Sequence, residues 1–236
     1  MTAADTLSTV AFTGYGIAVV AGLAFTYYAV QNYALDRMEG YEDFWGYLTY
    51  LGVAFAAFGL VGVWEVAVGG GSVVRAFADL TLLFGIAFGA FAMREVYYNS
   101  ALAPDPGEER VSLDRLRVVE FSFAAVVAVE WVVAAWVGQS AATVTLRGAA
   151  ALAFAGYGVA FSERLESLAR GTALDTLRRH LLLVLVCATG VAVADVLALV
   201  APASIAESTF HVFLVLLGGL LVPPTIRLQQ SVAGRQ

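Results

Sequence analysis

Glu130 is the most deeply placed ionisable residue in this sequence and the first candidate for chemistry. It stands twelve residues into an apolar stretch that begins at Val118, which corresponds to roughly 18 Å along a helix. A charge at the centre of a membrane-spanning helix costs about 3 kcal/mol on insertion scales. Glu130 therefore needs a partner, a wet cavity or a bound proton.

Four further ionisable groups within apolar stretches are candidates for a site with Glu130 in the outer half of the membrane: Glu65, Asp79, Asp195 and His211. Glu207 falls at the same depth and is expected to cap its helix. If these groups face one another, crowded carboxylates in a medium of low dielectric constant bind and release protons or a small cation. The sequence therefore predicts a ligand- or ion-binding site made of these five residues.

Each of the five residues also has a structural alternative. Glu65 lies close enough to the end of its apolar stretch to suit the membrane interface, and His211 suits a structural hydrogen bond. Asp79 and Asp195 suit buried hydrogen bonding as well as they suit function. For Glu130 the alternative is a protonated carboxyl group bonded to a tyrosine or to the backbone.

Seven long apolar stretches must position these residues, and each has the ~20 residues that a helix needs to cross a bilayer. They are predicted at residues 10–33, 44–68, 76–98, 118–138, 148–168, 173–200 and 205–227. The stretches and their short connections use nearly the whole chain. The predicted fold is therefore all-α: a single domain, residues 1–236, that forms a bundle of seven transmembrane helices.

The composition agrees with a protein that lies mostly in lipid. Hydrophobic residues make up 60% of the 236 residues, against about 45–50% in soluble domains. All 13 basic residues are arginine, and 19 acidic residues give a net charge of −6. This balance argues against nucleic acid as a partner. The acidic, lysine-free composition resembles that of proteins from extremely halophilic archaea.

The placement of arginine predicts the orientation, because cytoplasmic loops carry the basic excess. With the amino terminus outside and the carboxyl terminus inside, ten arginines flank the helices on the inner side, and only Arg75 and Arg147 lie in outer loops. Arg94 and Glu95 fall near the inner end of the third helix and are expected to anchor it at the interface. We therefore predict a multi-pass protein of the cell membrane.

Enzymatic chemistry is not expected from this chain. It contains neither an HExxH nor a GxSxG motif. His180 and His211 are expected on opposite sides of the membrane, so no metal site is predicted. The layout of seven helices with the amino terminus outside resembles that of microbial rhodopsins, a family that binds retinal through a lysine of the seventh helix. This chain has no lysine, and no cofactor is expected.

A short internal similarity suggests a duplication. Residues 14–18, GYGIA, in the first helix match residues 156–160, GYGVA, in the fifth. Both helices are predicted to run from outside to inside, so helices one to three and five to seven would form parallel repeats around the fourth, in a 3+1+3 plan. The alternative is that these small residues permit close contact between helices.

Two functions are consistent with these patterns. The first is a small carrier or channel that binds a proton or cation at the predicted carboxylate site. The second is a non-enzymatic sensor, receptor or membrane-complex subunit, in which the same groups hold a ligand or fix the packing. Its arginine-rich inner segments, residues 99–117 and 169–179, would contact a cytoplasmic protein. The lipid bilayer is a partner in both.

Overall fold

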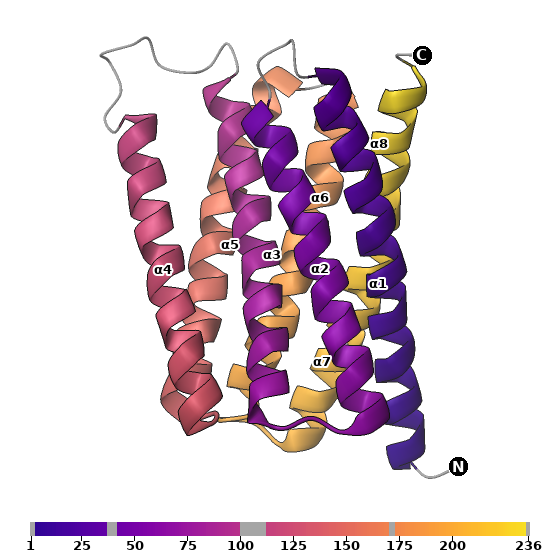
Figure 1. The fold of residues 1–236 in the computed structure, drawn as a ribbon, viewed down its shortest axis with the longest axis vertical. Coiled ribbons are helices and arrows are strands. Elements are labelled where there is room, and N and C mark those ends of the chain that lie inside the picture. The colour runs from indigo at the N-terminus through magenta and orange to yellow at the C-terminus, as the bar shows by residue number, and fades with distance from the viewer. Residues whose placement is uncertain (1–2, 37–41, 100–111, 170–172, 235–236) are drawn as a thin grey trace.

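The computed structural model describes residues 3–36, 42–99, 112–169 and 173–234, and these residues form helices and no strand (Figure 1). The helices are α1 (Ala3–Asp36), α2 (Glu42–Val68), α3 (Ser72–Tyr98), α4 (Leu113–Val137), α5 (Ala141–Ala169), α6 (Ala173–Leu197), α7 (Ala203–Leu220) and α8 (Val222–Ala233). Within the described residues, seven spans are long and apolar enough to cross a membrane, with α7 and α8 together forming the last. The prediction of an all-helical chain with seven such spans is confirmed.

Six of the seven spans begin earlier than the apolar stretches predict, and in two of them this changes the environment of an arginine. The third helix starts at Ser72 rather than at residue 76, and the fifth at Ala141 rather than at residue 148. Arg75 and Arg147, predicted in outer loops, are therefore helical. The hydrophobic run of a helix does not mark its ends, because polar residues continue the helix beyond the run.

The last span bends where α7 meets α8. Pro223 and Pro224 occupy the start of α8, where proline is tolerated because the first backbone N–H groups of a helix have no partner within it. These prolines therefore begin a helix that continues to Ala233, beyond the predicted end at residue 227. Asn32 of α1 fixes α8 in place, because its side-chain amide donates to the Leu228 carbonyl at 3.0 Å.

Six of the seven spans close into a ring, and α4 stands outside it. Around the ring α1 packs on α2, α2 on α3, α3 on α5, α5 on α6, α6 on α7 and α7 on α1. Helix α4 lies at the edge of the bundle, against α3 and more lightly against α5 (Figure 1). Helices one to three and five to seven thus pack in the same order, although α3 also contacts α6 with no matching contact between α7 and α2. The duplication stays a prediction.

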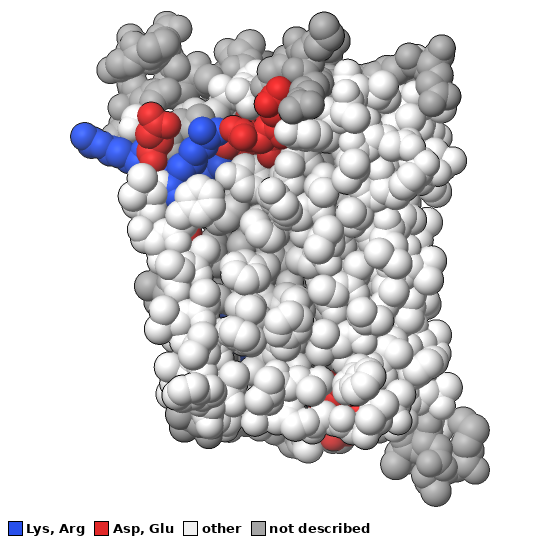
Figure 2. Space-filling model, in the orientation of Figure 1, with Lys and Arg blue, Asp and Glu red and all other residues white. Residues whose placement is uncertain are grey.

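The lateral surface is apolar, as contact with lipid requires. In Figure 2 the middle of the visible face is almost free of charged side chains, which gather near the two ends. Leu23, Val53, Leu60 and Val119 are among the large apolar residues that expose about half or more of their surface. A soluble protein rarely exposes so extensive an apolar area. The surface is compatible with an integral membrane protein surrounded by a bilayer.

Helices α1 and α2 approach each other closely at glycines of both helices. A Cβ atom added at Gly22 would lie 2.7 Å from the backbone nitrogen of Ala56. One added at Gly59 would lie 2.7 Å from the carbonyl oxygen of Tyr15. Small residues at a helix crossing let the two backbones approach, which is the main source of attraction between helices in lipid.

We expect Gly22→Val to force α1 and α2 apart, because its side chain would meet backbone atoms that cannot move independently. Overpacking of this kind costs about 1–3 kcal/mol. Gly16→Val is the matched control, because an added Cβ at Gly16 meets no atom within 4 Å. Thermal unfolding in detergent measures both variants against the unmodified protein. Equal losses of stability in the two would contradict the proposed crossing.

Candidate functional site

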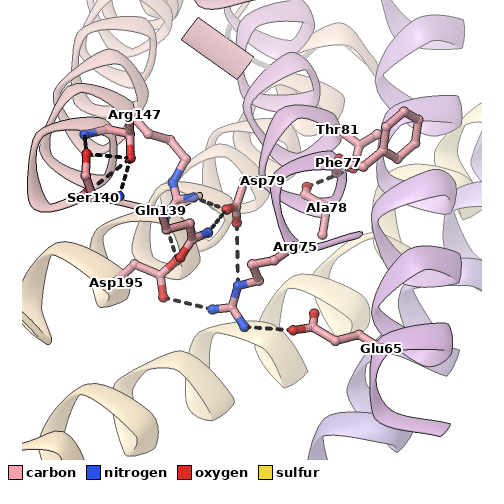
Figure 3. Close-up of polar contacts among 11 residues, drawn as sticks. Glu65, Arg75, Phe77, Ala78, Asp79, Thr81, Gln139, Ser140, Arg147 and Asp195 are labelled. Carbon is pink, nitrogen blue, oxygen red and sulfur yellow. Dashed lines mark hydrogen bonds and ion pairs between the residues drawn. The ribbon is translucent and has the colours of Figure 1, made fainter. Parts of the chain in front are cut away.

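A group of five charged side chains lies at the amino-terminal end of the bundle, the end at which α1 begins (Figure 3). We call it the carboxylate cluster. It contains three carboxylates and two arginines that come from four helices: Glu65 of α2, Arg75 and Asp79 of α3, Arg147 of α5 and Asp195 of α6. Three of the predicted site residues are thus brought together.

Arg75 occupies the centre of the carboxylate cluster. Its guanidinium group donates to Glu65 Oε1 at 3.2 Å and to Asp195 Oδ1 at 3.1 Å. Asp79, one helical turn further along α3, has its Oδ1 atom 3.9 Å from Arg75 Nε. The Arg75 side chain is 34% exposed, so this bridge between α2, α3 and α6 stays accessible from the cavity described below.

Arg147 joins the other side of the carboxylate cluster and is more deeply buried. Its guanidinium group pairs with Asp79 and, at 2.5 Å, with Asp195 Oδ2. Only 7% of the Arg147 surface is exposed. Gln139, in the turn between α4 and α5, adds a hydrogen bond from its amide to Asp79 Oδ2 at 2.6 Å. Asp79 Oδ2 therefore accepts hydrogen bonds from both Arg147 and Gln139.

A cavity of about 720 Å³ opens beside the carboxylate cluster at the amino-terminal end of the bundle. Its walls come from α1, α2, α3, α6 and α7, and its polar lining includes Tyr15, Glu65, Arg75, Asp195, Glu207 and His211. The Arg75 guanidinium lies over the ring of Phe210, 5.9 Å from the ring centre. The cavity therefore gives a solute access to two carboxylates and one arginine of the carboxylate cluster, and to Glu207.

The charge of the carboxylate cluster favours a positive ligand. When all five groups are ionised, three carboxylates against two guanidinium groups leave one negative charge, and Glu207 adds another on the cavity wall. Among the described residues, no three His, Cys, Asp or Glu side chains come together as a metal site would require. Arginines separate the carboxylates, so the ligand that this arrangement suits is a proton or a monovalent cation.

The remaining two predicted site residues are not part of the carboxylate cluster. His211 lines the cavity, but its Nδ1 atom lies 2.6 Å from the Glu207 carbonyl oxygen of its own helix, which fits the structural alternative. Glu130 belongs to α4, and its side chain lies outside the described part of the structure. Its role stays a prediction.

Sequence reasoning missed the cationic half of the carboxylate cluster, Arg75 and Arg147, as well as Gln139. Counting apolar residues assigned both arginines to loops, where they served only to predict the orientation. One available signal was the spacing of Arg75 and Asp79, four residues apart, which places them on one helix face if the helix begins before Arg75. No comparable signal marked Arg147, because its partners come from other helices.

A second charged group closes the opposite, carboxyl-terminal end of the bundle. We call it the buried arginine network, and its centre is Arg94 of α3, which has no exposed surface. Arg94 pairs with Glu120 of α4 and, at 2.5 Å, with Glu95. The Tyr157 hydroxyl donates to Glu120 at 2.5 Å, and the Tyr47 hydroxyl lies 3.3 Å from Arg94 Nη2. The expectation that Arg94 and Glu95 anchor α3 at the interface is wrong, because both are buried.

Arg117 extends the buried arginine network towards the surface. Its guanidinium group donates to Glu95 at 3.1 Å and to Asp43 of α2 at 2.5 Å. Arg117 and Glu120 both belong to α4, so this helix is joined by ion pairs to α2 and α3. The network therefore holds α4 against the bundle at the carboxyl-terminal end.

The segments predicted to dock a cytoplasmic partner are described only in part. Residues 100–111 and 170–172 lie outside the described residues. Arg178 and Arg179 belong to α6, and each pairs with Asp175 at 2.8 Å. Arg178 also donates to the Ser162 carbonyl at 2.7 Å, so it contributes to packing between α5 and α6. Docking through these segments stays a prediction.

The chain matches no family model and no curated protein. What it does must therefore be inferred from its own side chains. The carboxylate cluster, with its open cavity, and the buried arginine network at the opposite end are the two features that any function has to use.

Proposed function

We propose that this chain is a small membrane carrier or channel for a proton or a monovalent cation, which binds at the carboxylate cluster. One observation carries the proposal: Glu65 and Asp195, each about one-fifth exposed, reach the wall of an open cavity whose charged groups sum to a negative value. An ionisable residue within a membrane span is costly and is expected to serve an ion pathway.

The difference between the two ends of the bundle supports a gated pathway. At the amino-terminal end a cavity reaches Glu65, Arg75 and Asp195 of the carboxylate cluster. At the other end a cavity of about 740 Å³ reaches Asp43 and Tyr47 but not Arg94 or Glu95, which stay buried in ion pairs. Helix α3 carries residues of both groups, and Asp79 and Arg94 are separated by roughly 22 Å along its axis. A carrier needs one end accessible while the other is closed.

Arg75 acts in this proposal as an internal substitute for the transported cation. It bridges Glu65 and Asp195 and supplies the positive charge that pairs with Glu65 in the cavity wall. A proton or a small cation that reaches one of these carboxylates competes with the guanidinium group for it. Binding therefore weakens a contact between helices, which couples occupancy to movement of α2, α3 and α6.

Flux in proteoliposomes tests the proposal. The purified protein is reconstituted, and a gradient of H⁺, Na⁺ or K⁺ is imposed while a dye selective for that ion is followed. We expect saturable flux of one of the three ions and a decrease of about tenfold, equal to about 1.4 kcal/mol, in Asp195→Asn and in Glu65→Gln. Flux that is absent for all three ions would contradict a carrier or channel for these ions.

Glu163→Gln provides the matched control, because Glu163 is an exposed carboxylate remote from the cavity. It should leave flux unchanged at equal amounts of folded, reconstituted protein. Binding of one ion without any flux, measured by its protection against thermal unfolding, would favour the sensor or subunit alternative. The carboxylate cluster would then be an ion-binding site of a protein that does not transport the ion.

A further inference from the structure

Two buried hydrogen-bond donors beside the carboxylate cluster have no partner. They are the indole Nε1–H of Trp131 in α4 and the Nε–H of Arg147 in α5. Arg147 is more than nine-tenths buried, and its other two nitrogens pair with Asp79 and Asp195. Leaving a buried donor unpaired costs about 1–3 kcal/mol, so two such donors on residues that line one cavity indicate a small acceptor in it.

Both donors line the same cavity, which lies between α3, α4 and α5. Its volume is about 20 Å³, and Asp79, Gln139 and Thr143 provide further polar groups in its wall. A cavity needs about 10–15 Å³ on this measure, and two to four polar partners, to hold a water molecule. The space therefore accommodates one water molecule.

We propose that this cavity binds a single water molecule, which accepts hydrogen bonds from Trp131 and Arg147 and donates one to Asp79. The Asp79 carboxylate has about four lone-pair positions, of which described donors use the two on Oδ2. A water molecule accepts from both orphan donors and also donates a hydrogen bond to the Asp79 carboxylate. A halide ion would satisfy the donors but would be repelled by the negative charge of Asp79.

The water site gives α4 a polar connection at the amino-terminal end of the bundle. Among the described side chains of α4 at this end, Trp131 makes an edge-to-face contact with Phe77, whose ring centre is 5.9 Å away. A bound water joins the Trp131 indole to Asp79 and Arg147, and thus α4 to α3 and α5. This inference stands whether or not the chain transports a cation.

Infrared difference spectroscopy of the full chain in lipid tests the site. We expect a sharp O–H stretching band of an ordered water that moves to lower frequency in H₂¹⁸O. Trp131→Phe keeps an aromatic ring but removes the N–H donor, and the band should be lost or displaced. Trp136→Phe is the matched control, because Trp136 is 90% exposed, and it should leave the band in place.

Ala134→Val distinguishes the loss of the water molecule from the loss of the Trp131 indole. Ala134 lines the cavity and is buried, so a larger side chain fills the space while both donors remain. The water band should disappear, and the Trp131 N–H band should move to the higher frequency of an unbonded indole. An isotope-sensitive band that survives in both variants would overturn the proposal. An N–H band that shifts with chloride but not with H₂¹⁸O would do the same, because it would identify an anion site.

Discussion

Replacing Arg94 with methionine should cost this protein about 3–5 kcal/mol of unfolding free energy, which is the usual loss when one partner of a buried ion pair is removed. Arg94 has no exposed surface, and it pairs with Glu95 and Glu120, of which 1% and 7% are exposed. Without the guanidinium group, both carboxylates are left in a medium that solvates them poorly. Arg117 still reaches Glu95, and Tyr157 still reaches Glu120, but neither contact replaces the lost charge at the centre.

Unfolding in mixed detergent micelles, followed by circular dichroism, measures this loss. Arg94→Met combined with Glu120→Gln should recover part of it, because the double variant buries one negative charge fewer. The Arg115→Met variant is the control, since Arg115 is exposed near the start of α4 and should change stability by less than about 0.5 kcal/mol. A single Arg94→Met variant as stable as the control would show that the buried arginine network does not hold the bundle together.

Replacing Arg147 with methionine should have an effect of similar size at the other end of the bundle. Arg147 is 7% exposed and binds Asp79 and Asp195 together, so its loss leaves two carboxylates dependent on Arg75 alone. We expect a loss of about 3–5 kcal/mol. Arg147→Met combined with Asp79→Asn should recover part of it, because the uncompensated negative charge is then removed.

Arg75 offers a contrast within the carboxylate cluster. It bridges Glu65 and Asp195 but is one-third exposed at the cavity wall, and solvent-exposed ion pairs contribute only about 0–1 kcal/mol. The same unfolding measurement should therefore rank Arg147→Met far below Arg75→Met in stability. If the two variants lost equal amounts, burial would not be what sets the energetic role of each arginine.

Water in the cavity explains why two arginines with shared partners should behave differently. If Arg75 is removed, water in the 720 Å³ cavity can solvate the freed carboxylates. Arg147 is buried and does not line that cavity. Under the proposed function, Arg147 positions Asp79 and Asp195, and Arg75 exchanges with the ligand. These two roles also explain why the carboxylate cluster contains two arginines. With one arginine, its three carboxylates would leave two uncompensated negative charges.

The sequence by itself determined the number and nature of the spans. A bilayer requires about 20 apolar residues for each helix and hydrogen bonding of the whole backbone within the span. Both requirements are local, so seven apolar stretches sufficed to predict seven membrane-compatible helices. The cost of charge in lipid is also a property of each stretch, and it led to Glu65, Asp79 and Asp195 before any contact was known.

Only the tertiary structure decided which charges meet. Successive residues of a helix point about 100° apart, and a single sequence does not give the rotation of each helix about its axis or its order around the ring. The same limit applied to Arg94 and Glu95, predicted at the interface but buried because α4 supplies Glu120 beside them. Arg75 and Arg147 are helical because α3 and α5 begin before the apolar runs do, and the rotation of these helices brings both arginines to the carboxylates. Ion pairing across helices is a non-local property, and it turned two predicted loop arginines into half of the candidate site.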